Sequence, residues 1–174
     1  MQELKEWIVS DNGKDHIGKV AASLGNDAEK FSALIAIILQ NQPKYAQKAA
    51  WVMEHCCNQY PQLADPHISA LLELCPKDVH PGVRRAILHV LEKRPMNEDQ
   101  TGIALEMAFE FLQAADELVA AKSYAMGMIM HLSAEYPELR NELKLHLEAQ
   151  LPHQSPAFKS KAVKILTALN KKKS

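Results

Sequence analysis

The sequence predicts an all-α protein built from repeated helical hairpins. Three observations predict this class. Apolar residues recur at three- and four-residue spacing, all nine prolines fall between these segments, and an eleven-residue pattern returns 76 positions later. No stretch alternates convincingly as a β-strand does. With 174 residues, 47% of them hydrophobic, such helices can bury a core.

The N-terminal part predicts short helices followed by a strongly apolar one. Two periodic stretches, which contain Trp7 and Val20, meet at Asn12-Gly13 and predict two short helices. The segment ALIAIILQ, residues 33–40, is apolar almost all round and follows a capping-box signal at Asn26 and Glu29. We expect the N-terminal helices and the first repeat to enclose it. A contact between two chains, and hence a homodimer, is the alternative.

The repeat is visible when Met53–Leu63 is laid on Ile129–Leu139, because the histidine, the Tyr-Pro pair and the following leucine coincide. An intermediate copy lies between the two, so the period is about 38 residues. Each copy predicts a first helix, a proline-marked turn and a second helix. The predicted hairpins are 43–60 with 65–75, 80–94 with 97–114 and 118–136 with 138–150, closed by a helix at 156–172.

This organisation predicts one domain, residues 1–174. Capping helices occupy 1–42, the repeats occupy 43–77, 78–115 and 116–152, and a capping helix with a basic tail occupies 153–174.

One copy resembles a known repeat family. The segment DVHPGVRRAILHVL, Asp78–Leu91, is similar to the first helix of a HEAT repeat, and the resemblance covers about residues 43–172. It implies a short right-handed α-α superhelix, a HEAT/armadillo-like solenoid of about four helical hairpins. The copy that starts near Pro43 departs from the pattern, and the period is shorter than the roughly 40–47 residues of such repeats.

The resemblance also implies a structural ladder. In HEAT repeats, an aspartate and an arginine six positions apart form hydrogen bonds between successive repeats. Asp78 and Arg84 match this pair, and Asp116 with Lys122 repeats the spacing.

Two motifs imitate catalytic or metal chemistry. His55, Cys56 and Cys57 are consecutive, and on a helix such residues point about 100° apart, so they cannot converge on one ion. Cys56 takes the place of Leu132 in the repeat, which favours packing. The segment GKDHIGKV resembles a phosphate loop but has Val20 where a hydroxyl is needed and lies in a helical context. We therefore predict no metal, cofactor or catalytic residue, and an enzyme is not favoured.

Charge separates the two kinds of helix. The first-helix windows hold 13 basic and three acidic residues, whereas the second-helix windows hold three basic and nine acidic. If second helices line the concave binding surface of a solenoid, that surface is acidic. Four glutamates recur along it, namely Glu73, Glu106, Glu110 and Glu148. We expect a protein-interaction or scaffold module that binds a partner protein or basic peptide there.

Two alternatives to this binding surface stay open. Glutamates favour helices, so the acidic stripe can be no more than a solvated face. The second alternative is a nucleic-acid-binding protein, similar to the HEAT-like alkylpurine DNA glycosylases, although these use a positive concave groove. Phosphate contacts would then come from basic residues elsewhere, namely Arg84, Arg85, Lys159, Lys161, Lys164 and Lys171–Lys173.

The remaining expectations concern location. No apolar run reaches the roughly 18 residues of a membrane span, and the first residues lack a signal-peptide pattern. Three cysteines fit reduced thiols. We expect a cytoplasmic protein without a membrane partner.

Overall fold

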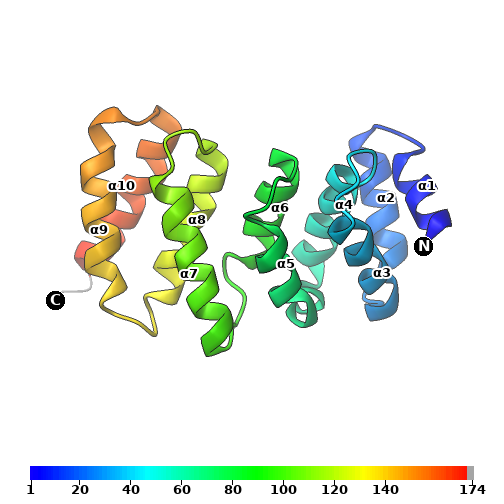
Figure 1. Cartoon of the computed structure of the whole chain (residues 1–174), viewed down its shortest axis with the longest axis horizontal. Helices are drawn as coiled ribbons and strands as arrows, with labels where there is room; N and C mark the ends of the chain where they lie inside the picture. The colour runs from blue at the N-terminus through cyan, green and yellow to red at the C-terminus, as the bar shows by residue number, and fades with distance from the viewer. Residues whose placement is uncertain (172–174) are drawn as a thin grey trace. The chain divides into compact units, whose positions relative to one another are not determined.

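A computed structural model describes residues 1–171, and Figure 1 shows its helices in chain order. The described residues form ten α-helices, two short 3-10 helices and no β-strand, as the periodicity predicts. The helices are α1 (Gln2–Val9), α2 (Lys14–Leu24), α3 (Ala28–Leu39), α4 (Ala46–Gln59), η1 (Pro61–His67), α5 (Ile68–Leu74), α6 (Pro81–Leu91), α7 (Glu98–Gln113), α8 (Val119–Leu132), α9 (Leu139–Gln150), η2 (Leu151–His153) and α10 (Pro156–Lys171).

The chain forms two compact units. The first comprises Met1–Met96 and the second begins at Asn97. The boundary lies between α6 and α7, inside the hairpin predicted for residues 78–115. The single-domain organisation therefore stays a prediction, and each unit is described by itself.

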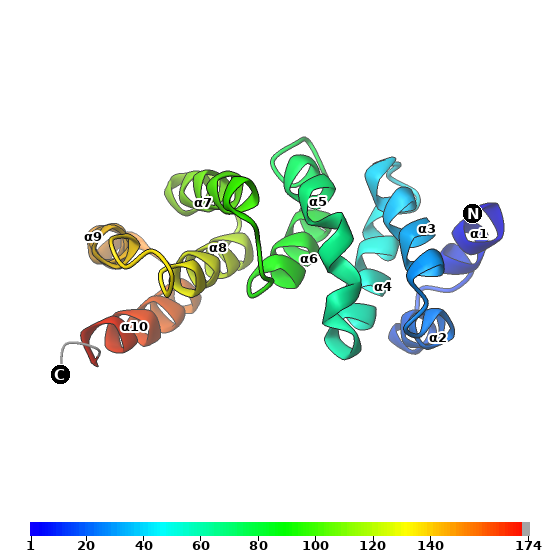
Figure 2. The ribbon, with the colours of Figure 1, turned by 90° about the horizontal axis from the view of Figure 1, so that it is seen from below.

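The first unit is built around α4, which packs against α2, α3, α6 and η1. In Figure 2, α2, α4 and α6 lie along one side of this unit, and α3 and α5 lie along the other. The apolar helix α3 is enclosed, because Leu34, Ile35, Ile37 and Ile38 are at most 1% exposed. Enclosure within one chain, the favoured expectation, is confirmed, and these side chains offer no surface to a second chain.

The second unit pairs α7 closely with α8, and α8 also packs against α9 and α10. Figure 2 shows α7 and α9 on one side of this unit and α8 and α10 on the other. Alanines at the contact, such as Ala104, Ala108 and Ala125, are fully buried. Because their side chains are small, the two helix backbones can approach closely.

Several helix starts follow local sequence signals. The Ser155 hydroxyl accepts a hydrogen bond from the Phe158 N–H ahead of α10, which begins at Pro156 as predicted. Asn97 and Gln100 form a reciprocal capping box on α7. At α3 the cap is Asp27, one residue after the expected Asn26, because the Asp27 carboxylate accepts the N–H groups of both Glu29 and Lys30 at 3.0 Å.

Two predicted helices are shorter than expected. The helix predicted for 65–75 begins only at Ile68, because Pro61–His67 forms a 3-10 helix. Asp65 does not cap it. The Asp65 carboxylate instead accepts two hydrogen bonds, of 2.8 and 2.9 Å, from the Arg94 guanidinium. The helix predicted for 118–136 ends at Leu132, where the chain turns toward Pro137.

Arg84 connects consecutive helices through the backbone. Its guanidinium donates to the carbonyl oxygens of Cys75 and Lys77, at 3.1 and 3.0 Å, just past the end of α5. Such carbonyls have no partner within their own helix, and a cation there also complements the helix dipole. The pairing of Arg84 with Asp78, implied by the family pattern, stays a prediction.

Lys122 stands 38 residues after Arg84 and is 3% exposed. Its ammonium has no hydrogen bond or ion pair with any residue that the structure describes. Asp116, its partner in the implied ladder, is exposed. The carbonyls that would correspond to those bound by Arg84 are those of Gln113 and Ala115, 38 residues further along the chain.

We predict that Lys122→Arg raises the free energy of unfolding by about 0.5–1 kcal/mol, because a planar guanidinium can reach two carbonyls at once. Arg84→Lys should lower it by about 1 kcal/mol for the same reason. Urea denaturation followed by circular dichroism measures both changes. An Arg84→Lys variant with unchanged stability, together with a destabilised Lys122→Arg variant, would contradict this interpretation.

Candidate functional site

The glutamates predicted to form an acidic ladder fall in both units. Glu73 lies on α5 in the first unit, and the other three lie on α7 and α9 in the second. Glu73 is exposed, and its Oε1 atom accepts a hydrogen bond of 2.8 Å from the Lys77 ammonium. This contact lowers the pKa of Glu73. Glu73 is therefore already partly neutralised.

Helix α7 carries an uncompensated acidic face. Its 16 residues include Glu98, Asp99, Glu106 and Glu110 and no lysine, arginine or histidine. All four are exposed, and Asp99, Glu106 and Glu110 lie on the side of α7 away from its buried alanines. Among residues 1–171, no ion pair joins Glu106 or Glu110 to a basic side chain. These carboxylates are the freest of the predicted site residues.

Helix α9 adds an apolar group to this face. Leu145 is 68% exposed, and Ile103 on α7 is 50% exposed, so both place large apolar side chains in solvent beside carboxylates. Glu148 lies 3.7 Å from Lys144 on its own helix. The two helices meet through the rings of Phe109 and His146, whose centroids are 5.4 Å apart.

We call this set of exposed residues the acidic second-helix surface of the second unit. Its members are Asp99, Ile103, Glu106 and Glu110 on α7 with Glu142, Leu145 and Glu148 on α9. Sequence reasoning identified three of the glutamates but missed Ile103 and Leu145. The available signal was the helical period. Leu145 is two positions from both Leu143 and Leu147, which are fully buried, so its side chain points to the opposite side of the helix.

A buried ion cluster in the first unit was also missed. Glu54 on α4 is 6% exposed, and its carboxylate binds two side chains of α6. The Arg85 guanidinium donates to both carboxylate oxygens, and His89 Nδ1 lies 2.6 Å from Oε1. The signal that could have found this cluster is the repeat itself, because Glu54 stands where the later copy has Met130.

The cluster keeps Glu54 ionised. Burial alone raises the pKa of this carboxyl, but the hydrogen bonds from His89 and Arg85 and their positive charge outweigh burial and lower the pKa below 4.5. The cluster joins the first helices of two successive repeats inside one unit. Glu54 is buried between the two helices and its partners Arg85 and His89 are half-buried, which indicates a structural contact.

Other basic residues around α6 are also engaged. Arg94 forms a bidentate contact with Asp65, and Arg84 binds backbone carbonyls. All three arginines of the predicted basic first helix therefore contact the protein itself. Exposed lysines remain on α10, including Lys159 and Lys164, while Lys172 and Lys173 lie outside the described residues.

The cysteines lie in the core, in agreement with the packing interpretation. Cys56 is 2% and Cys57 8% exposed, and Cys75 is fully buried. Burial raises the pKa of Cys56 to about 11 and that of Cys57 to about 12, so both are thiols at neutral pH. Within residues 1–171, no group of three or more histidine, cysteine, aspartate or glutamate side chains is arranged to hold a metal ion.

The segment that resembles a phosphate loop is helical. Lys14–Leu24 forms α2, with Gly18 and Lys19 in its interior, and α1 precedes it in place of a strand. Among the described helices, none combines the length and the apolar character that a membrane span requires.

A comparison with models of protein families identifies a family for the chain. A family model described as a HEAT repeat domain matches residues 4–169, nearly the whole chain. No curated protein and no solved structure matches the chain.

We predict that Glu54→Gln lowers the free energy of unfolding by about 2 kcal/mol at pH 7, because the half-buried Arg85 and His89 lose their anion. A carboxyl whose pKa is lowered by folding stabilises the fold above its unfolded pKa, and this contribution is lost as pH falls through the folded value. The difference between wild type and variant should therefore shrink below about pH 4.5.

Urea titrations at several pH values measure this difference, with the exposed Glu135→Gln variant as control. A difference that stays constant from pH 7 to the acid limit of the folded state would show that the Glu54 charge does not contribute.

We predict that the double variant Cys56→Ala, Cys57→Ser has the same metal content as wild type. Its free energy of unfolding should fall by about 1–2 kcal/mol, because buried volume is removed. Elemental analysis and thermal unfolding measure the two quantities. Stoichiometric zinc in the native protein that the double change removes would overturn the packing interpretation.

Proposed function

Since the chain belongs to the HEAT repeat domain family, whose repeats commonly mediate protein interactions, we propose that it is an interaction or scaffold module. We propose that it binds a basic segment of a partner protein on the acidic second-helix surface.

The observation that carries this proposal is the free acidic face of α7. The exposed carboxylates of Glu106 and Glu110 are one turn apart and repel each other, and no basic residue of that helix offsets them. A lysine- or arginine-rich segment would relieve this repulsion and form charge-assisted hydrogen bonds. Charge complementarity of this kind mainly speeds association and selects the partner.

Exposed apolar groups would supply the affinity that surface ion pairs lack. Surface ion pairs contribute little affinity because water screens them. Ile103 and Leu145 are 50% and 68% exposed, and burial by a partner would remove their apolar area from water. We therefore expect the bound segment to carry apolar side chains among its basic residues.

The contacts of the arginines favour a protein ligand over a nucleic acid. A phosphate backbone is bound through free cationic side chains. Arg84, Arg85 and Arg94 each contact carbonyl or carboxylate oxygens of the chain itself. Of the basic residues predicted for phosphate contacts, the lysines of α10 would then have to supply such a surface.

Glu73, the remaining glutamate of the predicted ladder, lies in the first unit, and we propose it as a separate contact for a cation. It lies on a second helix, as the α7 glutamates do, and its partner Lys77 is an exposed lysine of the same turn. Exposed pairs of this kind are weak, so an incoming cation can replace Lys77. We expect Glu73 to contribute less than Glu106 and Glu110.

We predict that Glu106→Lys with Glu110→Lys weakens partner capture at least tenfold without unfolding the chain, since both residues are exposed. Wild-type protein first captures partners from the native cell extract, and mass spectrometry identifies them. Binding of the purified partner to wild type and variant is then measured by calorimetry.

A matched control is Glu135→Lys with Glu138→Lys, two exposed residues at the turn before α9 that change the net charge equally. If the control loses as much affinity as the α7 variant, net charge explains the effect and the proposed surface is wrong. Unchanged capture by the α7 variant would contradict the proposal as well.

A further inference from the structure

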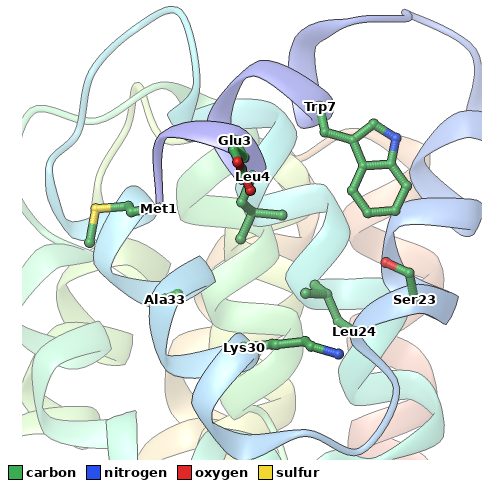
Figure 3. Close-up of a pocket in the computed structure, with 8 residues that line it drawn as sticks. All are labelled: Met1, Glu3, Leu4, Trp7, Ser23, Leu24, Lys30 and Ala33. Atoms are coloured by element: carbon green, nitrogen blue, oxygen red, sulfur yellow. The ribbon is translucent and has the colours of Figure 1, made fainter.

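A cavity at the N-terminal end of the first unit is unrelated to the acidic second-helix surface. It measures about 570 Å³ and lies between α1, α2 and α3 (Figure 3). Sites for small organic molecules typically measure about 300–1,000 Å³. Its lining residues are Met1, Glu3, Leu4, Trp7, Ser23, Leu24, Lys30 and Ala33.

The walls of the cavity are aromatic and aliphatic. In Figure 3 the Trp7 indole lies on one side, and Leu24 lies across the cavity from it. Trp7 is 40% exposed although it is the largest apolar group of α1. A half-exposed indole facing a leucine-lined cavity suits a flat aromatic ligand, which would cover apolar area that water now contacts.

The Trp7 side of the cavity is held in place. Ile8, the next residue, is fully buried. Lys5 Nζ donates to the side-chain amides of Gln40 and Gln42, which fixes α1 to the turn after α3. The backbone oxygen of Trp7 also accepts a hydrogen bond of 2.7 Å from His16 Nε2. The indole is therefore presented by a positioned helix, which limits the entropy lost on binding.

The cavity is lined by the hydrogen-bond donors of Lys30, Ser23 and Trp7. Figure 3 shows the Lys30 ammonium beside Leu24, across the cavity from α1, whereas Glu3 lies on α1, the helix that carries Trp7. The indole N–H of Trp7 has no partner among the described residues. Lys30 lies 3.5 Å from Asp27, but both side chains are exposed, 57% and 42%, so this pair leaves the ammonium available.

We propose that this cavity binds a small aromatic carboxylate. The ring would lie between Trp7 and Leu24, and the carboxylate would face Lys30. The Lys30 ammonium selects an anion over a neutral molecule of the same shape, and the Glu3 carboxylate on α1, across the cavity from Lys30, disfavours an anion. The site uses residues of the first unit only, so its failure would leave the proposed protein-binding function untouched.

Three probes of equal shape test the charge selection: 2-naphthoate, 2-naphthylmethanol and 2-naphthylmethylammonium. We expect the carboxylate to bind two- to fivefold more tightly than the alcohol, and the ammonium to bind most weakly. Quenching of Trp7 fluorescence in the Trp51→Phe background of the full chain reports binding at this cavity.

Charge variants then locate the effect. Lys30→Gln should remove the preference for the carboxylate over the alcohol, and Glu3→Gln should strengthen carboxylate binding. The matched control is Lys19→Gln, an exposed lysine of α2 outside the lining, which should change nothing. All three replaced side chains are exposed, so each variant should fold.

Equal affinity for the three probes, a preference for the ammonium, or no binding would overturn the proposal. Carboxylate selection that survives Lys30→Gln would overturn it too, because the anion would then be bound elsewhere. Trp7→Phe should weaken the binding of all three probes. Ligand-observed NMR measures this binding, because the variant lacks the Trp7 fluorescence signal. Unchanged affinity in that variant would also count against this cavity.

Discussion

The first unit depends on the burial of α4 on three sides. Most of this helix is inaccessible to water, including Ala49, Ala50 and Met53, which are fully buried. A helix of this kind cannot be stable alone and gains its stability from neighbours. Its neighbours α2, α3 and α6 all pack against it. The other contacts of this unit, including the enclosure of α3, follow from that requirement.

Burying α4 so completely also buries a carboxylate. Glu54 would be costly to bury alone, because desolvation disfavours the charged form. Arg85 and His89 of α6 supply the compensating hydrogen bonds. Such a cluster adds little net stability compared with an apolar contact, but it tolerates few alternative arrangements of the two helices. Its contribution to the fold is therefore mainly to fix how α6 packs on α4.

The sequence predicts those features that depend on neighbouring residues. Helix starts at Asn97 and Pro156 are recognisable because a cap and its target lie within one turn. The 3-10 helix before α5 is not, because Asp65 is bound by Arg94, 29 positions away. The same applies to the cavity beside Trp7, which three separate helices create. Long-range contacts of this kind leave no local pattern.

The acidic surface shows a different limit of sequence reasoning. Spacing identified Glu106 and Glu110 correctly as residues of one exposed helix face, because a 3.6-residue period defines a face without any knowledge of the partner helix. It could not show that Glu148 lies near Lys144 or that Leu145 is exposed. Rotamers and packing decide these details, and they convert a stripe of charge into a surface with both acidic and apolar groups.

Counting charges along the chain also overstates how basic the first helices are in solution. Arg84, Arg85 and Arg94 contribute to that count, but carbonyl and carboxylate oxygens of the chain bind each of them. Lys122 contributes too and is 3% exposed. The carboxylates of α7 have no such internal partners in the described chain. A formal net charge of −1 therefore understates the negative charge that α7 presents, on which the proposed binding of a basic segment rests.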